Sequence, residues 1–522
     1  MRLLITGGDC RLARAADAAF ASEHQVLLVD THFSAPLPSN LETHVGDLRD
    51  LAFVNPLLNA IDAVLHLAPI AQSSGDDAHD LDVATRGTYQ LYNAAVATGV
   101  QRFILGSTLA LFDQLPARWR INEAWCPRPT PQIDDLRAWM SELCVRELTR
   151  DLGIASICLR FGQVLDESDL AMRPFEPRWL HMTDAIEGIR CALDYQAHGW
   201  SIFHITAAGQ RAKVRLAEAA KPLFGYQPLH DFHDYWPENV ASSETQAAPA
   251  MRPSTPTRPI HSVAIFGAGG PLAVAGATEL ASKYTLRLTD VQPIAEIAER
   301  PIPQYPGAPL PRVLELPHEC LVVDVCDFDA VLAACAGMDA IVNCSVIRND
   351  PVEAWRVNVL GAYNLLRAAA IHGIRRVVHT GPYQIAPLGF TSYIWDYDIA
   401  DDSPPRPGSK HGFQLYFHSK YLAQELCRVF ADHYGLEIPA LLFAQFVDPH
   451  QPPDGDLYPF AVSWADAARA IQCALMVETL PAPYEVLHIV ANLPHGVFPN
   501  RKARQVLGWQ PHDSLAEFWS ET

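Results

Sequence analysis

An internal repeat is the feature that most constrains how this chain can fold. The run LLITGG at residues 3–8 returns as VAIFGAGG at residues 263–270. Further landmarks keep the same order in both halves, about 260 to 280 positions apart: Asp30 and Asp290, Asp47 and Asp324, Asp62 and Asp339, Val100 and Ile374, Ser141 and Ser419, and Asp184 and Asp466. A duplicated domain with small insertions leaves such drifting offsets. The alternative is two unrelated α/β domains that share a common pattern.

Each half alternates short aliphatic runs with helical stretches. Residues 26–29, 63–65 and 102–105 are strand-like, whereas residues 91–96 are typical of a helix. This alternation predicts parallel strands joined by right-handed crossovers. We therefore expect an α/β fold of two tandem Rossmann-like doubly wound parallel-sheet domains.

The length and composition agree with two domains. With 522 residues, 49% of them hydrophobic, the chain can bury two sizeable cores. The first domain is expected at residues 1–237 and the second at residues 263–522. Between them, residues 238–262 are rich in Pro, Ser, Thr and Ala without an apolar period, which predicts a linker.

Charge and cysteine usage narrow the function classes. A formal net charge of −20 disfavours nucleic acid and anionic membranes as partners, but it does not prevent phosphate binding by backbone N–H groups. The eleven scattered cysteines form no C-x-x-C pair, and no cluster has metal-ligand spacing. No signal peptide or membrane span is recognised. These features predict a soluble, cytoplasmic protein with free thiols and a small-molecule substrate.

The glycines after the first strand of the second copy are typical of a dinucleotide-binding loop. Gly267, Gly269 and Gly270, followed by Ala273, would let the backbone approach a pyrophosphate at a helix N-terminus. A glycine-rich turn without a ligand is the alternative. In the first copy, Cys10 places a side chain where close approach is needed, so binding there is doubtful.

Acids at two strand ends would hold the adenosine part of such a cofactor. Asp290 lies where a carboxylate can bind the ribose hydroxyls and repel a 2′-phosphate, which favours NAD over NADP. Its alternative role is to cap a turn. Asp324 and the backbone N–H of Val325 follow the third strand and are assigned to the adenine.

On these residues the chain resembles the extended short-chain dehydrogenase/reductase superfamily, and within it the NAD-dependent epimerase/dehydratase group. The resemblance covers about residues 1–235 and 260–520 and includes Asn358 and the Tyr416-x-x-x-Lys420 motif. It implies NAD as cofactor, a cofactor-binding role for Asn358 and a contact of Lys420 with the nicotinamide ribose. It also implies pairing through the Tyr-Lys helix, so the two copies are expected to form an intramolecular pseudo-dimer, or else a homo-oligomer.

Tyr416 and Lys420 are the predicted acid/base pair. One helical turn places them on the same face, and an ammonium beside a phenol stabilises the phenolate. Tyr416 would then exchange a proton with a substrate hydroxyl. The alternative is a surface helix with an incidental Tyr and Lys. In the first copy, alignment on Ser141 puts Ala138 and Glu142 at these two positions, which predicts a degenerate domain.

The second copy departs from the family at its Ser/Thr position. By register with Ser107 in the first copy, that position falls on Gly381 and Pro382. Thr380 is the candidate catalytic hydroxyl, with Tyr383 as an alternative, and a third alternative is that the site lacks such a group. The short segment at residues 446–461 leaves little protein to hold a nucleotide diphosphate, which favours a small polyol, sugar acid or similar compound.

The sequence thus predicts an NAD-dependent oxidoreductase or epimerase that acts through its second domain on a small hydroxyl or carbonyl substrate. Two other hypotheses stay open. One is a non-catalytic NAD-binding sensor or scaffold, and the other is an active site that the first copy completes.

Overall fold

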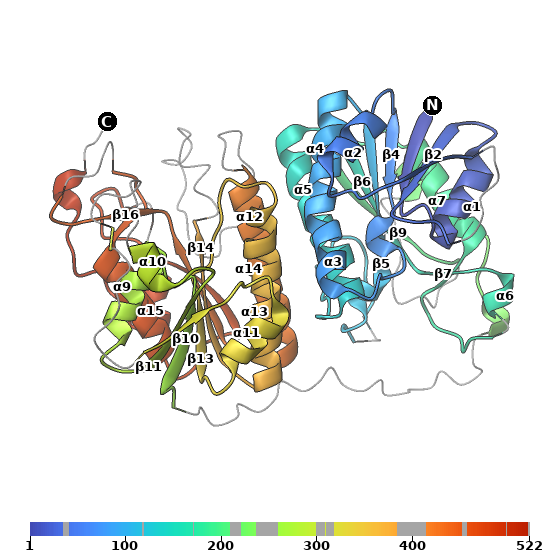
Figure 1. The fold of residues 1–522 in the computed structure, drawn as a ribbon. Coiled ribbons are helices and arrows are strands. Elements are labelled where there is room, and N and C mark those ends of the chain that lie inside the picture. Colours follow the sequence, from blue (N-terminus) through green and yellow to red (C-terminus); the bar gives the residue numbers. More distant parts are fainter. Residues whose placement is uncertain are drawn as a thin grey trace. The chain divides into compact units, whose positions relative to one another are not determined.

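The structure, a computed structural model, describes residues 1–34, 41–116, 119–170, 172–208, 221–235, 259–298, 308–309, 318–383, 414–451, 457–496, 498 and 500–519. The chain divides into two compact units, Met1–Ala250 and Met251–Thr522. Each unit contains a seven-stranded sheet with helices on both faces (Figure 1). This confirms the predicted fold class. Most of the predicted linker lies outside the described residues.

The first unit has the strand order β3-β2-β1-β4-β5-β6-β9, with every neighbouring pair parallel. The strands are β1 (Arg2–Thr6), β2 (Gln25–Asp30), β3 (Glu42–Val45), β4 (Ala63–His66), β5 (Arg102–Thr108), β6 (Ala155–Phe161) and β9 (Trp200–Ile205). Helices α1 (Arg11–Phe20) and α7 (Met182–Asp194) pack together, as do α2 (Leu51–Leu57), α4 (Thr88–Thr98) and α5 (Ile133–Leu152). Both faces of the sheet are thus covered, which is why its central strands read as continuous aliphatic runs.

The second unit repeats this order as β12-β11-β10-β13-β14-β15-β18. Its strands are β10 (Ser262–Phe266), β11 (Thr285–Asp290), β12 (Glu319–Val322), β13 (Ala340–Asn343), β14 (Arg376–Pro382), β15 (Ile438–Phe443) and β18 (Tyr484–His488). In Figure 1, helices α9 (Pro271–Leu280) and α15 (Trp464–Met476) cover one face, and α11 (Phe328–Cys335), α13 (Gly361–His372) and α14 (Gln414–Tyr434) cover the other. A small parallel pair, β16 (Gln445–Val447) and β17 (Ala461–Ser463), follows β15.

The two sheets share the register that the sequence predicted. His66 is opposite Leu105 in the first unit, and Asn343 is opposite His379 in the second. Further along the same strands, Ser107 is opposite Arg160 and Gly381 is opposite Leu442. Gly381 therefore occupies the strand position of Ser107, as the alignment of the two copies required.

Three further properties bear on function. No helix in the described part of the chain is long and apolar enough to cross a bilayer. All eleven cysteines fall within the described ranges and are free thiols. Over those same ranges, no three His, Cys, Asp or Glu side chains are grouped so that they could hold a metal ion.

Candidate active site

The glycine turn after β10 has the shape that a bound diphosphate requires. Gly267 has a φ of +75°, and a Cβ there would come within 2.8 Å of the Ser345 backbone nitrogen, so only glycine fits. The turn closes with a hydrogen bond from Gly270 N to Gly267 O (3.1 Å), and α9 begins at the next residue. A Cβ on Gly270 would meet only that carbonyl within 4 Å. The N-terminus of this ten-residue helix therefore leaves room for an anion.

Asp290 lies directly beside this turn. Its Oδ2 accepts a hydrogen bond from Gly269 N (2.9 Å), and its Oδ1 accepts one from Val291 N (2.8 Å). A Cβ on Gly269 would lie 3.1 Å from the same carboxylate and 2.6 Å from Ile297. Burial raises the pKa of Asp290, and the backbone N–H groups oppose this rise. The structure thus brings the predicted ribose-binding acid and the predicted glycine loop together.

Asp324 and Val325 form the turn after β12. The exposed Asp324 accepts a hydrogen bond from Cys326 N (2.8 Å). Val325 is buried under Gly361, where a Cβ would lie 2.7 Å from the valine side chain, and its carbonyl accepts from Asn364 Nδ2 (2.9 Å). These contacts fix the turn and leave the Asp324 side chain exposed to solvent. Its contact with an adenine stays a prediction.

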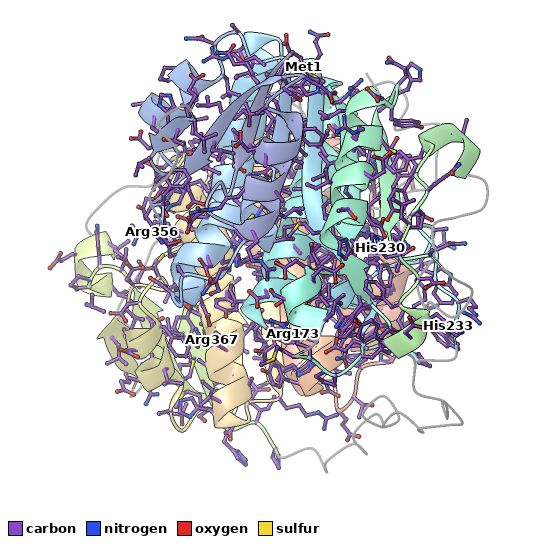
Figure 2. The ribbon with its side chains drawn as sticks, turned by 90° about the vertical axis from the view of Figure 1, so that its right-hand side faces the viewer. Met1, Arg173, His230, His233, Arg356 and Arg367 are labelled. Atoms are coloured by element: carbon purple, nitrogen blue, oxygen red, sulfur yellow. The ribbon has the colours of Figure 1, made fainter. Side chains whose placement is uncertain are left out.

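Asn358 lies in a π-helical turn, η5 (Arg356–Leu360), that leads into α13. Arg356 and Arg367, labelled in Figure 2, mark this turn and the helix after it. The Asn358 amide accepts from Ile347 N (3.2 Å) and donates to Ile347 O (2.8 Å) and to Ser419 Oγ (2.9 Å). Asn358 therefore holds the loop after β13 against α14, and the cofactor contact assigned to it stays a prediction.

Lys420 lies at the centre of the second unit and is only 2% exposed. Its Nζ donates to Ser345 O (2.9 Å) and more weakly to Thr380 O (3.4 Å), at the ends of β13 and β14. Burial lowers the pKa of Lys420 to about 8, with a further lowering from Arg348 that the nearby Cys344 opposes. The ammonium is thus fixed by backbone carbonyls next to the glycine turn.

Tyr416 lies one turn before Lys420 on α14 and is half-buried. It packs against an aromatic cluster of Tyr383, Phe417, Phe460 and Phe498. On another side, the Arg348 guanidinium lies 5.3 Å from the centre of its ring. The predicted acid/base pair therefore shares one face of α14 at the carboxyl ends of the central strands, where ligands bind in open α/β sheets.

The two candidate hydroxyls of the second unit are already engaged within the fold. Thr380 is 6% exposed, and its Oγ1 donates to Asn343 O (2.8 Å). Tyr383 Oη lies 2.6 Å from His488 Nδ1 within the aromatic cluster. Thr380 would have to rotate its proton away from Asn343 to serve a substrate, so its catalytic role stays a prediction that this contact does not favour.

Two residues near Lys420 carry no motif and were missed by the sequence argument. Arg348 follows β13 in a loop, so neither periodicity nor spacing marks it. Ser345 is buried beside Gly267, and its Oγ has no hydrogen-bond partner within the described ranges. An unpaired buried hydroxyl beside the glycine turn is consistent with a ligand at that place.

The described histidines near Lys420 do not form a catalytic group. Burial first, and Lys420 second, lower the pKa of His379 to about 3, so its ring stays neutral. His418 places Nδ1 3.1 Å from Gln414 O one turn earlier in α14. His411 lies outside the described residues.

The corresponding place in the first unit is closed by its own side chains. Glu142, at the position of Lys420, accepts hydrogen bonds from Ser107 Oγ and from Arg160 Nε (2.9 Å) and Nη2 (2.6 Å). The carbonyl of Ala68, which corresponds to that of Ser345, instead receives Arg137 Nη2 (2.7 Å). Ala138 stands at the position of Tyr416, so the phenol is absent there. This arrangement agrees with the predicted loss of acid/base chemistry.

The glycine turn of the first unit is also filled. Asp9 N donates to Asp30 Oδ2 (3.0 Å), as Gly269 does to Asp290, but the Asp9 carboxylate then binds Arg14. Cys10 Sγ accepts from Ala13 N (3.4 Å) at the start of α1. A thiol and a carboxylate thus occupy the space that glycines leave open in the second unit.

The fold and the site of the second unit define the class. A doubly wound parallel sheet with a glycine turn, an acid at the end of its second strand and a Tyr-Lys pair is a dinucleotide-binding α/β enzyme domain. The model of the NAD dependent epimerase/dehydratase family matches residues 3–165 and 274–477. The chain therefore belongs to this family, with one match in each unit, and NAD is its cofactor.

Similar curated proteins are sugar dehydrogenases. The chain is 24% identical over 277 residues to an NAD-dependent glucose-6-phosphate dehydrogenase of Haloferax volcanii, covering 50% of this chain and 96% of that protein. It is 29% identical over 205 residues to a uronate dehydrogenase of Agrobacterium fabrum, covering 38% and 71%. A solved glucuronic acid dehydrogenase from Chromohalobacter salexigens is 20% identical, with a TM-score of 0.40 over 45% of this chain and 86% of that one.

Proposed function

We propose that the second unit is an NAD-dependent oxidoreductase that acts on a hydroxyl, or on the corresponding carbonyl, of a small sugar or sugar-acid-like substrate. The observation that carries this proposal is the placement of Tyr416 and Lys420 on one face of α14, with Lys420 bonded to the carbonyl of Ser345 beside the glycine turn. The sugar dehydrogenases among the relatives support the substrate class.

Each residue of the candidate site has its own role in the proposed reaction. Gly267, Gly269 and Gly270 would hold the diphosphate and Asp290 the adenosine ribose, and bound NAD supplies an acceptor for hydride. Tyr416 as phenolate accepts the proton from the substrate hydroxyl, while the C–H electron pair leaves the same carbon as hydride. Lys420 stabilises the phenolate, because an adjacent positive charge lowers the pKa of a phenol.

The same residues run the reverse reaction. A protonated Tyr416 gives its proton to the oxygen of a carbonyl substrate as hydride arrives at the carbon. Thr380 is kept in this proposal as the group that would polarise that oxygen, provided that its hydroxyl releases the Asn343 carbonyl. In the first unit Ala138 and Glu142 replace this acid/base pair, and we assign that unit a structural role.

Tyr416→Phe tests the function. Purified protein is incubated with NAD and a panel of aldoses, uronates and sugar phosphates, and NADH is followed by absorbance. The wild type is expected to turn over at least one of them. The variant should lose about 100-fold or more in kcat, as for removal of a general acid/base, with NAD affinity unchanged in calorimetry. NAD binding without turnover on the whole panel would instead support a sensor or scaffold.

The arrangement of the two units is a separate proposal. A single particle in which the first unit takes the place of a second subunit would satisfy the pairing that the family resemblance implies. Small-angle scattering at several concentrations checks it. A compact monomeric profile supports the pseudo-dimer, whereas two separated lobes or a concentration-dependent mass contradicts it.

A further inference from the structure

Arg348 is a cation placed against the proposed acid/base residue. It lies in the loop after β13, three residues after Ser345, whose carbonyl binds Lys420. Its guanidinium is 5.3 Å from the ring centre of Tyr416. A guanidinium on an aromatic face keeps its N–H groups, which lie in its plane, available to a ligand at its edge.

Arg348 has no carboxylate partner within the described ranges. Other arginines of the second unit do have one there; these are Arg287, Arg356, Arg375, Arg376, Arg428 and Arg469. Lys420 is bonded to two carbonyls. Two neighbouring cations thus lie at the reaction site of a chain whose formal net charge is −20. Grouping like charges costs free energy unless an anion joins them.

Hydrogen bonds fix the loop backbone directly before Arg348. Both backbone polar groups of the preceding residue, Ile347, are bonded to the Asn358 side chain, at 3.2 Å and 2.8 Å. The third bond of Asn358, to Ser419 Oγ, ties this loop to the helix that carries Tyr416. In the first unit Ala84 replaces Asn358 and Ala71 replaces Arg348 by the same alignment. The Asn358 hydrogen bonds that hold this loop and the Arg348 cation are therefore features of the second unit alone.

We propose that Arg348 binds an anionic group of the substrate, a carboxylate or a phosphate, while the hydroxyl to be oxidised lies at Tyr416. The inference rests on the proposed function, and it narrows the substrate class to sugars that carry a negative charge. Because the guanidinium packs on the Tyr416 ring, the anion and the reacting hydroxyl must belong to one compact molecule. Arg348 is then a specificity-determining residue, and Lys420 adds to the local positive charge.

Matched substrates and variants test the inference. Wild-type protein, Arg348→Gln and Arg348→Lys are compared on glucuronate, glucose 6-phosphate and glucose with NAD. The wild type should prefer one of the two anionic sugars over glucose. Arg348→Gln should lose about 10- to 100-fold in kcat/KM on that sugar, the range for a charge-assisted hydrogen bond, and little on glucose. Arg348→Lys should keep part of the preference. Arg504→Gln, on helix α16 (Arg501–Leu507), removes a charge that binds Asn500 and Asn492 and should change nothing.

A binding measurement separates this inference from the proposed function. Glucuronate and glucose 6-phosphate are titrated into the NAD-loaded protein by calorimetry. Binding that Arg348→Gln weakens supports the anion site even without turnover, and the sugar that binds tells carboxylate from phosphate. A preference for glucose, equal losses on charged and neutral sugars, or anion binding that survives in Arg348→Gln would overturn it.

Discussion

Glu142 and Arg160 form a buried ion pair in the first unit, with 2.6 Å between Oε2 and Nη2 and about 3% of each side chain exposed. In the second unit the same two positions carry Lys420 and Leu442. The first unit thus differs by a linked change, in which a carboxylate replaces the Lys420 ammonium and an arginine on β6 neutralises it. Ser107 donates to the same carboxylate, so the counterpart of the Lys420 position is part of the core in the first unit.

Breaking this pair should destabilise the first unit strongly. Arg160→Met leaves the Glu142 carboxylate buried without its cation, and we expect a loss of about 3–5 kcal/mol in the free energy of unfolding. The double variant Glu142→Met with Arg160→Met removes both charges and should recover most of that loss. Urea unfolding followed by circular dichroism measures both. A loss below about 1 kcal/mol in Arg160→Met contradicts a tightly packed site. NAD affinity, which we propose to reside in the second unit, serves as the control.

The fold and part of the candidate site could be predicted because they follow from local sequence. Gly269 and Asp290 are 21 positions apart and meet because one strand–helix–strand unit joins them. Tyr416 and Lys420 meet because they are one helical turn apart.

The remaining contacts depend on tertiary packing. Glu142 meets Arg160, 18 positions away, only because α5 lies over β6. Arg348 reaches Tyr416 only because the Asn358 amide fixes the course of an irregular loop. No periodicity or spacing encodes contacts of this kind, so only the structure could reveal them.

Lys420 should make the stability of the second unit depend on pH. Its folded pKa of about 8 is below its ordinary value of 10.5, so between these values the unfolded chain binds more protons and stability rises with pH. Below about pH 8 the cost of burying the ammonium is fully present. Lys420→Met removes this cost and its pH dependence, whereas the wild type gains stability as the pH rises. The free energy of unfolding of the variant, relative to that of the wild type, should therefore fall by up to about 3 kcal/mol from pH 7 to pH 10.5.

Urea titrations across this range measure the effect. Lys283→Met is the control, because Lys283 is an exposed lysine of the same unit whose Nζ donates to Gln472 Oε1 (2.9 Å) near the surface. A difference between Lys420→Met and wild type that stays constant with pH would show that burial of the ammonium does not perturb Lys420.

Asp290 should decide both the affinity for NAD and the preference over NADP. Asp290→Asn keeps an oxygen to accept the Gly269 N–H but loses the charge, so NAD binding should weaken about 10- to 100-fold. NADP binding should weaken less or improve, since the repulsion of its 2′-phosphate is relieved. Calorimetric titration with each cofactor gives the two affinities and the stoichiometry, which we expect to be one NAD per chain. Asp30→Asn in the first unit is the matched control. An equal loss of NAD affinity in that variant would contradict the assignment of the cofactor to the second unit.

Gly381→Ser tests whether the missing hydroxyl limits turnover. In the first unit Ser107 occupies the same strand position and reaches Glu142, the counterpart of Lys420, so a serine at position 381 should point toward the reaction site. Its Cβ would lie 2.9 Å from Gln424 Nε2 and 3.2 Å from Leu442 Cδ2, and both are ends of side chains that can shift. Gly381→Ala makes the same steric demand without the hydroxyl. We expect kcat of Gly381→Ser to exceed that of Gly381→Ala by about tenfold or more, because a positioned donor stabilises the charge that develops on the substrate oxygen. Equal kcat values in two variants of equal melting temperature would mean that another group, with Thr380 the first candidate, already supplies that hydrogen bond.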